Sequence, residues 1–153
     1  MNQSPENQVY LTDCPLCGEA GGTLLYEMPQ LRVVLVEDAL HPGFCRVIWR
    51  SHVQEFTELP PAARVLCMQV VCEVEQAMRE VMRPDKINLA SLGNMTPHLH
   101  WHIIARYNDD AHFPQPVWGQ QQRSPDAAWR AEKIALIPPL QQNIATRCAT
   151  LNM

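Results

Sequence analysis

The chain has 153 residues, of which 46% are hydrophobic and 18% are charged, and its formal net charge at pH 7 is −4. These values are typical of one compact domain with a sizeable core. The negative net charge does not favour the strongly basic surface with which proteins bind polynucleotides. No apolar run approaches the ~20 residues that cross a bilayer, and residues 1–6 lack the basic and apolar stretches of a signal peptide. We therefore expect a soluble, cytoplasmic protein with neither a membrane nor a nucleic-acid polymer as its partner.

The first half of the chain predicts two paired strands and a long helix. Residues 1–9 show no pattern and are expected to be frayed. Residues 31–37 and 44–49 are rich in Val, Ile and Leu and predict an antiparallel pair of strands. From residue 60 or 61 an apolar stripe recurs at i, i+3, i+4 and i+7, which predicts a helix that Pro84 ends. The stripe consists of Cys67, Val70, Val71, Val74, Ala77, Met78 and Val81.

The second half predicts two further strands and terminal helices. Residues 86–92 and 98–106 carry strand signals on either side of a short turn. After a polar loop, Ser124-Pro125-Asp126 has the cap, the proline and the early acid that begin a helix, and Pro138-Pro139 interrupts the helical pattern that follows. This order of elements indicates an α+β fold with a mainly antiparallel sheet, one long helix and C-terminal helices, not a parallel doubly wound sheet.

Three of the six histidines fall within five residues, at His98, His100 and His102. Side chains alternate along a strand, so the three imidazoles would share one face at a spacing of roughly 6.8 Å, while the apolar residues between them point into the core. Such a face has three interpretations. It could be merely polar, two alternate histidines could bind a catalytic zinc and its water, or one histidine could be a nucleophile. The zinc interpretation needs a further ligand, and none of the familiar metalloprotease spacings is present.

The segment His98-Leu99-His100-Trp101-His102-Ile103-Ile104 resembles the H-φ-H-φ-H-φ-φ signature of the histidine triad (HIT) proteins, which include nucleotide hydrolases and nucleotidyl transferases. The resemblance covers residues 14–118. Asn88 and the stretch from Gly93 resemble the family's phosphate-binding segment, and the run from Pro42-Gly43 resembles its strand after a P-G-H turn. The chain departs from the family pattern at three positions: Phe44 replaces a frequent histidine, Trp49 the usual proline, and Met95 a hydroxyl residue.

The resemblance implies a role for each residue of the motif. His100 would attack the α-phosphorus with one ring nitrogen while the other donates to a backbone carbonyl, and His102 would stabilise charge as the leaving group departs. Water would then hydrolyse the nucleotidyl-histidine. The residues expected to bind substrate are Asn88 through its amide, Gly93, Asn94 and Met95 through the phosphate-binding turn, and Glu37, or its neighbour Asp38, at the ribose.

The resemblance also implies a substrate class and an architecture. Residues 108–118 resemble a bacterial branch whose members are often described as diadenosine tetraphosphate hydrolases, so dinucleoside polyphosphates, adenylated amines or similar nucleotides are the expected substrates. Residues 1–153 would form one HIT domain, with its core at about 10–118 and a helical extension at about 124–150. The chain is expected to pair as a homodimer. A rival hypothesis is a nucleotide-binding regulatory module with weak turnover, but binding alone would not require both His100 and His102.

Cys14 and Cys17 form a C-x-x-C pair, which in a cytosolic protein could be a redox pair or two chance thiols. A redox pair is expected in a thioredoxin-like βαβ context, which the predicted elements lack. Many bacterial triad proteins resemble this chain in combining such a pair with two histidines, which here would be His52 and His98, and this implies a structural zinc on a Cys₂His₂ set. The other cysteines show no disulfide framework and are interpreted mostly as small buried hydrophobes.

Four further residues are expected to have no role in the reaction or only a minor one. His41 and His112 are expected to be solvated loop histidines. Arg106, which directly follows the histidine strand, could approach phosphate but is expected to be a surface arginine. Trp118 is a candidate cover for a nucleoside.

Overall fold

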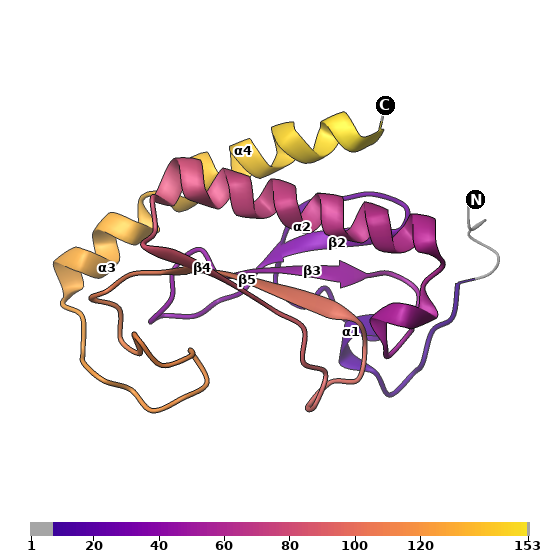
Figure 1. Cartoon of the computed structure of the whole chain (residues 1–153), viewed down its shortest axis with the longest axis horizontal. Helices are drawn as coiled ribbons and strands as arrows, with labels where there is room; N and C mark the ends of the chain where they lie inside the picture. The colour runs from indigo at the N-terminus through magenta and orange to yellow at the C-terminus, as the bar shows by residue number, and fades with distance from the viewer. Residues whose placement is uncertain (1–7, 153) are drawn as a thin grey trace.

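The computed structural model describes residues 8–152 and shows one five-stranded antiparallel sheet with the strand order β1-β2-β3-β5-β4 (Figure 1). The strands are β1 Thr23–Glu27, β2 Leu31–Leu35, β3 Cys45–Trp49, β4 Lys86–Ala90 and β5 His100–Arg106. The helices are α1 Pro15–Gly18, α2 Pro61–Met82, α3 Ala127–Ile134 and α4 Ile137–Ala149, with short 3₁₀ turns at Phe56–Glu58 and Thr150–Asn152. The predicted α+β fold with an antiparallel sheet is confirmed.

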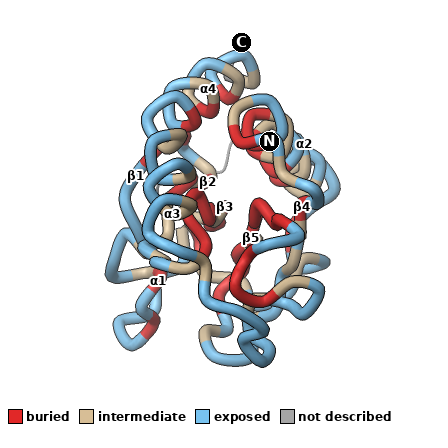
Figure 2. The backbone as a smooth tube through the Cα atoms, turned by 90° about the vertical axis from the view of Figure 1, so that its left-hand side faces the viewer, coloured by how far each residue is buried: buried red, intermediate tan, exposed pale blue. Residues whose placement is uncertain are grey.

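The long helix α2 covers one face of the sheet. Pro61 occupies its first turn, where the missing N–H costs no hydrogen bond, and the helix ends before Arg83, which adopts a left-handed conformation with φ 47°. Six of the seven residues of the predicted apolar stripe are buried against the sheet, and Val81 is partly buried. Helix α4 lies alongside α2 and adds three buried residues to the same core, Leu140, Ile144 and Cys148 (Figures 1 and 2).

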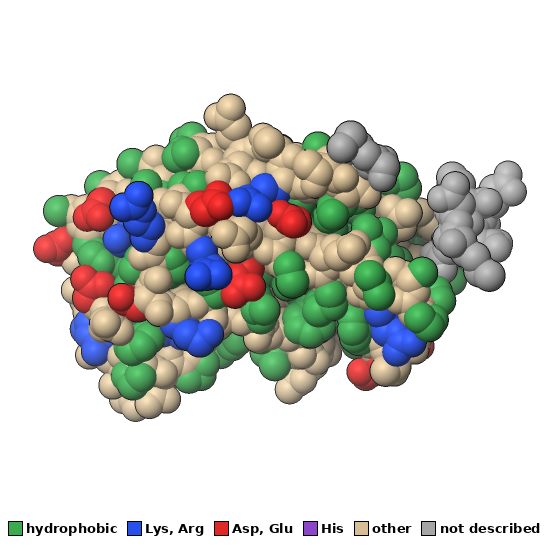
Figure 3. All heavy atoms as spheres, turned by 45° about the horizontal axis from the view of Figure 1, so that its top comes forward, with side chains coloured by type: hydrophobic (Ala, Val, Ile, Leu, Met, Phe, Trp, Pro, Cys, Tyr) green, Lys and Arg blue, Asp and Glu red, His purple; other side chains and the backbone are tan. Residues whose placement is uncertain are grey.

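Among the described residues, the opposite face of the sheet is covered by α1 and loops (Figure 1). A second, smaller apolar cluster lies on this side, where Cys14 and Leu16 pack on Val34 and Ile48 of the sheet. Figure 3 shows the helix-covered side, where charged and apolar side chains are mixed and no histidine of the described residues is visible. Among residues 8–152, no helix is long and apolar enough to cross a membrane.

The structure differs from the sequence-based expectations at three places. Strand β1 was not predicted, because it is an edge strand in which only Leu25 is buried. The cap of helix α3 is Asp126, two residues after the predicted cap Ser124, and its side chain accepts a hydrogen bond from the N–H of Trp129. Pro138 lies in the first turn of α4. Of the residues expected to be frayed, 1–7 lie outside the described residues. The N–H of Val9 donates to the hydroxyl of Ser51, and its carbonyl accepts from the N–H of His52.

Candidate functional site

The three clustered histidines lie at the start of β5 and immediately before it. All three are buried, with exposed fractions of 1% for His98, 7% for His100 and 5% for His102. Ile103 and the partly buried Trp101 pack in the core under α2, so the alternating side chains of His100 and His102 point to the opposite face. The ring centroids of His100 and His102 are 4.8 Å apart, closer than the spacing of alternate residues along a strand, and the two ring planes are nearly perpendicular, at 84°.

A backbone carbonyl fixes the tautomer of His100. Its Nδ1 lies 2.5 Å from the carbonyl oxygen of His98, which can only accept a hydrogen bond, so Nδ1 carries the proton and Nε2 keeps a lone pair. Burial lowers the pKa of His100, although the His98 carbonyl acts in the opposite direction, and the ring is therefore neutral at pH 7. A neutral imidazole with a fixed lone pair is the form that a nucleophile needs.

The ring of His102 is flanked by two aromatic side chains. Its ring centroid is 5.5 Å from that of Phe44 and 5.1 Å from that of Trp118, which is 52% exposed. Burial, the neighbouring His100 and the guanidinium of Arg46 together lower the pKa of His102 to about 4, so the ring is neutral at pH 7. Its Nδ1 is buried and has no hydrogen-bond partner among the described residues, which leaves a polar atom available to a ligand.

The expected phosphate-binding turn lies between β4 and β5. Gly93 has φ 78°, a conformation that favours glycine, and Asn94 and Met95 are exposed beside it, Met95 at 96%. Asn88, on β4, accepts a hydrogen bond of 2.8 Å through Oδ1 from Nη1 of Arg106, and this orients the side-chain amide and leaves its N–H groups free to donate. It also lines a surface pocket of about 450 Å³ together with Trp118.

The two acids before β3 have different environments. Asp38 accepts hydrogen bonds from the N–H groups of Leu40 and His41, so its carboxylate is used by the loop. Glu37 is exposed and makes no side-chain hydrogen bond or ion pair with another described residue. Of the two, Glu37 has the carboxylate that is available to a ribose.

Arg106 is not a surface arginine, and that expectation was wrong. It is 2% exposed, and its Nε and Nη2 donate to the carboxylate of the fully buried Asp110 at 2.8 and 3.1 Å. Burial raises the pKa of Asp110, but the bonds from Arg106 and from three backbone N–H groups outweigh it and hold the pKa at about 2. Since Arg106 also donates to Asn88 and to the carbonyl of Gln115, this buried pair fixes both a candidate substrate ligand and the loop after β5.

His41 and His112 are not solvated loop histidines either. They are 2% and 8% exposed, and Nε2 of His41 lies 2.8 Å from Nδ1 of His112. Such a hydrogen bond needs one protonated and one unprotonated nitrogen, and burial lowers the pKa of His41. The pair joins the loop before β3 to the loop that carries Trp118. Nothing in the sequence indicated this pair, because the two histidines are 71 positions apart.

Four sulfur and nitrogen atoms converge beside α1. Each of Cys14, Cys17, His52 and His98 offers one ligand atom, and these atoms lie within 4.8 Å of one another. Sulfur lies 3.4 Å from nitrogen between Cys14 and His98 and between Cys17 and His52, and 3.5 Å between Cys17 and His98. The Nδ1 atoms of the two histidines are 3.2 Å apart. A tetrahedral zinc with bonds of ~2.3 Å to sulfur and ~2.0 Å to nitrogen separates its ligands by roughly 3.3 to 3.8 Å.

The tautomer of His98 also suits a metal. Its Nε2 lies 2.6 Å from the carbonyl oxygen of Trp49 and must donate to it, so Nδ1 presents a lone pair to the two thiols and to His52. Burial lowers the pKa of His98, which favours the neutral ring that a metal requires. The four residues therefore fit a closed Cys₂His₂ site. The described cysteines are all free thiols, and of the four outside this cluster only Cys72 is exposed.

Comparisons with known proteins agree with this arrangement. The HIT domain model matches residues 18–109. A histidine triad protein from Bradyrhizobium japonicum is 31% identical over 82% of this chain and 92% of its own, with a TM-score of 0.68. One from Marinobacter aquaeolei is 31% identical over 90% of this chain and 99% of its own, also at 0.68. A zinc-bound histidine triad family protein from Mycobacterium smegmatis has a similar fold, at 23% identity and a TM-score of 0.55 over 92% of this chain and 96% of its own. None of the curated proteins compared with the chain matches it.

The buried histidine pair predicts a loss of stability at acidic pH. Because burial lowers the pKa of His41 from 6.5 in the folded protein, the unfolded chain takes up the proton first. The contribution to stability is therefore complete above about pH 6.5 and is lost as the pH falls toward the folded pKa, by at most ~1.4 kcal/mol per pH unit. Urea unfolding between pH 5 and pH 7 should give a shallower pH dependence for His41→Gln than for wild type. Because the other five histidines remain, equal slopes would show that His41 is not the group responsible.

Proposed function

The chain belongs to the HIT domain family, and we propose that it is a nucleotide hydrolase or nucleotidyl transferase that works through a nucleotidyl-histidine intermediate. Members of this family generally act on nucleotides in one of these two ways. The observation that carries the proposal is the hydrogen bond from Nδ1 of His100 to the carbonyl of His98, because it leaves Nε2 of a buried neutral ring as a nucleophile. Retention of this nucleophile beside His102 favours an enzyme over a regulatory module that only binds nucleotide.

The proposed reaction has two displacement steps. Nε2 of His100 attacks the α-phosphorus, and the bond to the leaving group breaks while His102 donates a hydrogen bond to a phosphate oxygen. Backbone N–H groups at Asn94 and Met95 and the amide of Asn88 bind the remaining oxygens. Water, or a second acceptor in a transferase, then attacks the phosphorus, which releases the nucleotide and restores His100.

We propose dinucleoside polyphosphates or related adenine nucleotides as substrates. Glu37 is the proposed ligand of the ribose hydroxyls, because its carboxylate has no partner among the described residues, whereas that of Asp38 is used by its own loop. Trp118 lies against His102 at the edge of the site, and an exposed aromatic ring in that position suits a nucleoside base.

The first test concerns the nucleophile. His100→Ala should abolish turnover and leave the fold intact, whereas His102→Ala should slow the reaction by roughly 10² to 10³-fold, the usual effect of removing one charge-stabilising donor. Rapid acid-free quenching of a reaction with α-phosphate-labelled dinucleoside polyphosphate should trap base-stable, acid-labile label on wild type and on His102→Ala.

The labelling also identifies the result that would contradict the mechanism. His100→Ala should carry no label under the same conditions. Equal labelling of wild type and His100→Ala, or turnover by His100→Ala, would mean that another group attacks phosphorus. The interpretation of the histidines as ligands of a catalytic zinc would then be the next to test.

We further propose that Cys14, Cys17, His52 and His98 hold a structural zinc. The support is that four distances between the ligand atoms, 3.2 to 3.5 Å, are close to tetrahedral spacing, and that the tautomer of His98 is fixed. When bound, the ion would fasten α1 to the start of β5. The four protein ligands would leave no coordination position open for water. The ion would therefore supply stability and not a water nucleophile.

Protein purified without chelator should contain about one zinc per chain. Cys14→Ser should lose most of this zinc and lower the melting temperature by about 5 °C or more, because a removed structural metal costs several kcal/mol. The matched control is Cys72→Ser, which changes an exposed thiol outside the cluster. Elemental analysis and thermal unfolding of the three proteins provide the measurement. Negligible zinc in wild type, with no difference between the two variants, would exclude the site.

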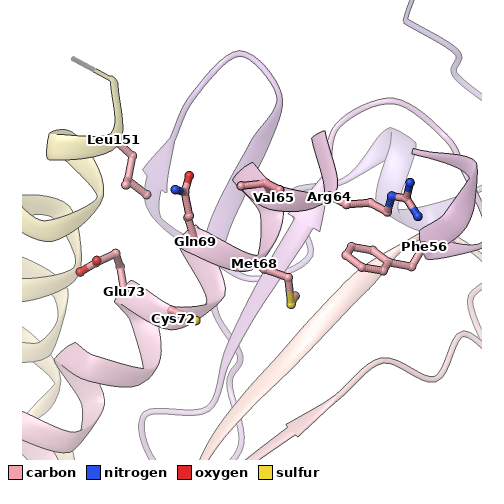
Figure 4. Close-up of a pocket in the computed structure, with 8 residues that line it drawn as sticks. All are labelled: Phe56, Arg64, Val65, Met68, Gln69, Cys72, Glu73 and Leu151. Carbon is pink, nitrogen blue, oxygen red and sulfur yellow. The ribbon is translucent and has the colours of Figure 1, made fainter. Parts of the chain in front are cut away.

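We also propose that the chain forms a homodimer through α2 and the free edge of β4. A groove of about 480 Å³ lies on the outward side of α2, where Phe56, Val65 and Met68 line it (Figure 4). Val65 is 57% exposed, and β4 is an edge strand whose backbone has a partner on one side only. A second copy would cover both features at once.

Light scattering at micromolar concentration should give twice the mass of one chain. Val65→Glu should shift the population to monomer, because it places a charge in the proposed apolar contact. Leu24→Glu, which changes a similarly exposed apolar residue on β1 at the opposite edge of the sheet, should leave the dimer intact. A monomeric wild type, or equal behaviour of the two variants, would refute this interface.

A further inference from the structure

Arg46 is a charged residue in an otherwise apolar strand, and the register of the sheet places it beside the histidines. In β3 it lies directly opposite His102 of β5, while Ile48 lies opposite His100. Residues that face each other across an antiparallel pair point to the same side of the sheet. The side chain of Arg46 therefore lies on the histidine face. A charge within the run from Phe44 to Trp49 was the only signal of it in the sequence.

The guanidinium of Arg46 has few hydrogen-bond acceptors and no counter-ion among the described residues. Its Nη1 donates a hydrogen bond of 3.2 Å to the carbonyl of Gly21, and its Nε is buried without a partner among the described residues. No carboxylate within residues 8–152 forms an ion pair with it. Burial lowers the pKa of Arg46, as expected for a cation that has lost water.

Two other arginines near the same face show what a satisfied guanidinium looks like. Arg32 donates to three backbone carbonyls, those of Leu16, Glu19 and Ala20. Arg106 is paired with the carboxylate of Asp110. Arg46 has neither arrangement, although it stands next to the reacting groups and its charge lowers the pKa values of both His100 and His102. A planar cation with free donors is suited to phosphate oxygens, which it can bind in a bidentate manner.

We propose that Arg46 binds the phosphate chain of the leaving group, so that the site selects nucleoside polyphosphates over nucleotides with an uncharged leaving group. This inference rests on the proposed function and specifies its substrate class. The position of Arg46 opposite His102, and not opposite His100, places its charge at the end of the site where the leaving group departs.

The chemistry of the step is consistent with this assignment. Nε2 of His100 forms a bond to the α-phosphorus, the bridging phosphorus–oxygen bond breaks, and its electron pair remains on the bridging oxygen of the departing phosphate. That oxygen gains negative charge, which a neighbouring guanidinium stabilises more in the transition state than in the ground state. An amine leaving group leaves no such phosphate and gains nothing from Arg46.

A comparison of two substrates tests the proposal. The values of kcat/KM are measured for diadenosine tetraphosphate and for adenosine 5′-phosphoramidate with wild type, Arg46→Gln and Arg46→Lys. Arg46→Gln should lose on the order of 10²-fold on the tetraphosphate and less than about 3-fold on the phosphoramidate, while Arg46→Lys should lose less than about 10-fold on the tetraphosphate. Arg79→Gln, which removes an exposed charge on α2, is the matched control and should change neither value. An equal loss on both substrates, or no loss on either, would overturn the proposal.

A binding measurement separates this proposal from the proposed function. Calorimetry with inorganic pyrophosphate needs no turnover, and we expect wild type and Arg79→Gln to bind it alike and Arg46→Gln to bind it at least about 10-fold more weakly. If wild type cleaves neither nucleotide but its pyrophosphate binding depends on Arg46, the proposed function fails and the anion site stands. If pyrophosphate does not bind, or binds equally to Arg46→Gln, the anion site itself is wrong.

Discussion

The site depends on the way β5 is held in the interior of the sheet. It is bonded to β3 on one side and β4 on the other, so its residues cannot slip by one position without exchanging the two faces. Trp101, Ile103 and Ala105, which alternate with the histidines along β5, belong to the core under α2, and their burial fixes the register. His100 and His102 are consequently presented on the face that the long helices leave free. The apolar core thus determines where the polar chemistry can be.

His98 connects the candidate metal cluster to the candidate nucleophile. Its Nδ1 faces the two thiols and His52, its Nε2 donates to the carbonyl of Trp49, and its own carbonyl accepts from Nδ1 of His100. Both ring nitrogens and the backbone oxygen are therefore engaged. A metal that restrains the ring would also restrain the carbonyl, and with it the tautomer of His100. On this view the cluster acts on the chemistry through position, with no contact to the substrate.

The sequence predicted those features that depend on local pattern. The period of the apolar residues was sufficient for α2, and the alternation around His98, His100 and His102 was sufficient for a histidine face. The ring distance was not predictable, because the strand repeat fixes backbone positions but not the lean of a side chain. Strand β1 carried too few buried residues to give a signal.

The errors all concern residues whose partners are brought to them by the fold. Arg106 and Asp110 are four residues apart, yet their burial depends on the loop that closes over them, and this loop has no apolar pattern. His41 and His112 come from different loops, so no spacing could relate them. A polar residue was taken to be exposed in each case. The general rule that buried polar groups are paired can only be applied once the pairs are known.

The buried polar groups of this face divide into two classes that have different consequences. Arg106 pairs with Asp110, and Nε2 of His41 bonds to Nδ1 of His112, and both pairs hold the loops around the site, including the one that carries Trp118. Arg46 and Nδ1 of His102 lack such partners among the described residues, and leaving them so costs the folded state free energy. Residues that only supported the fold would gain by having partners. Because Arg46 lies opposite His102, we expect an anion to bind where their unpaired atoms meet, and in a chain with a net charge of −4 the guanidinium supplies a local positive charge there.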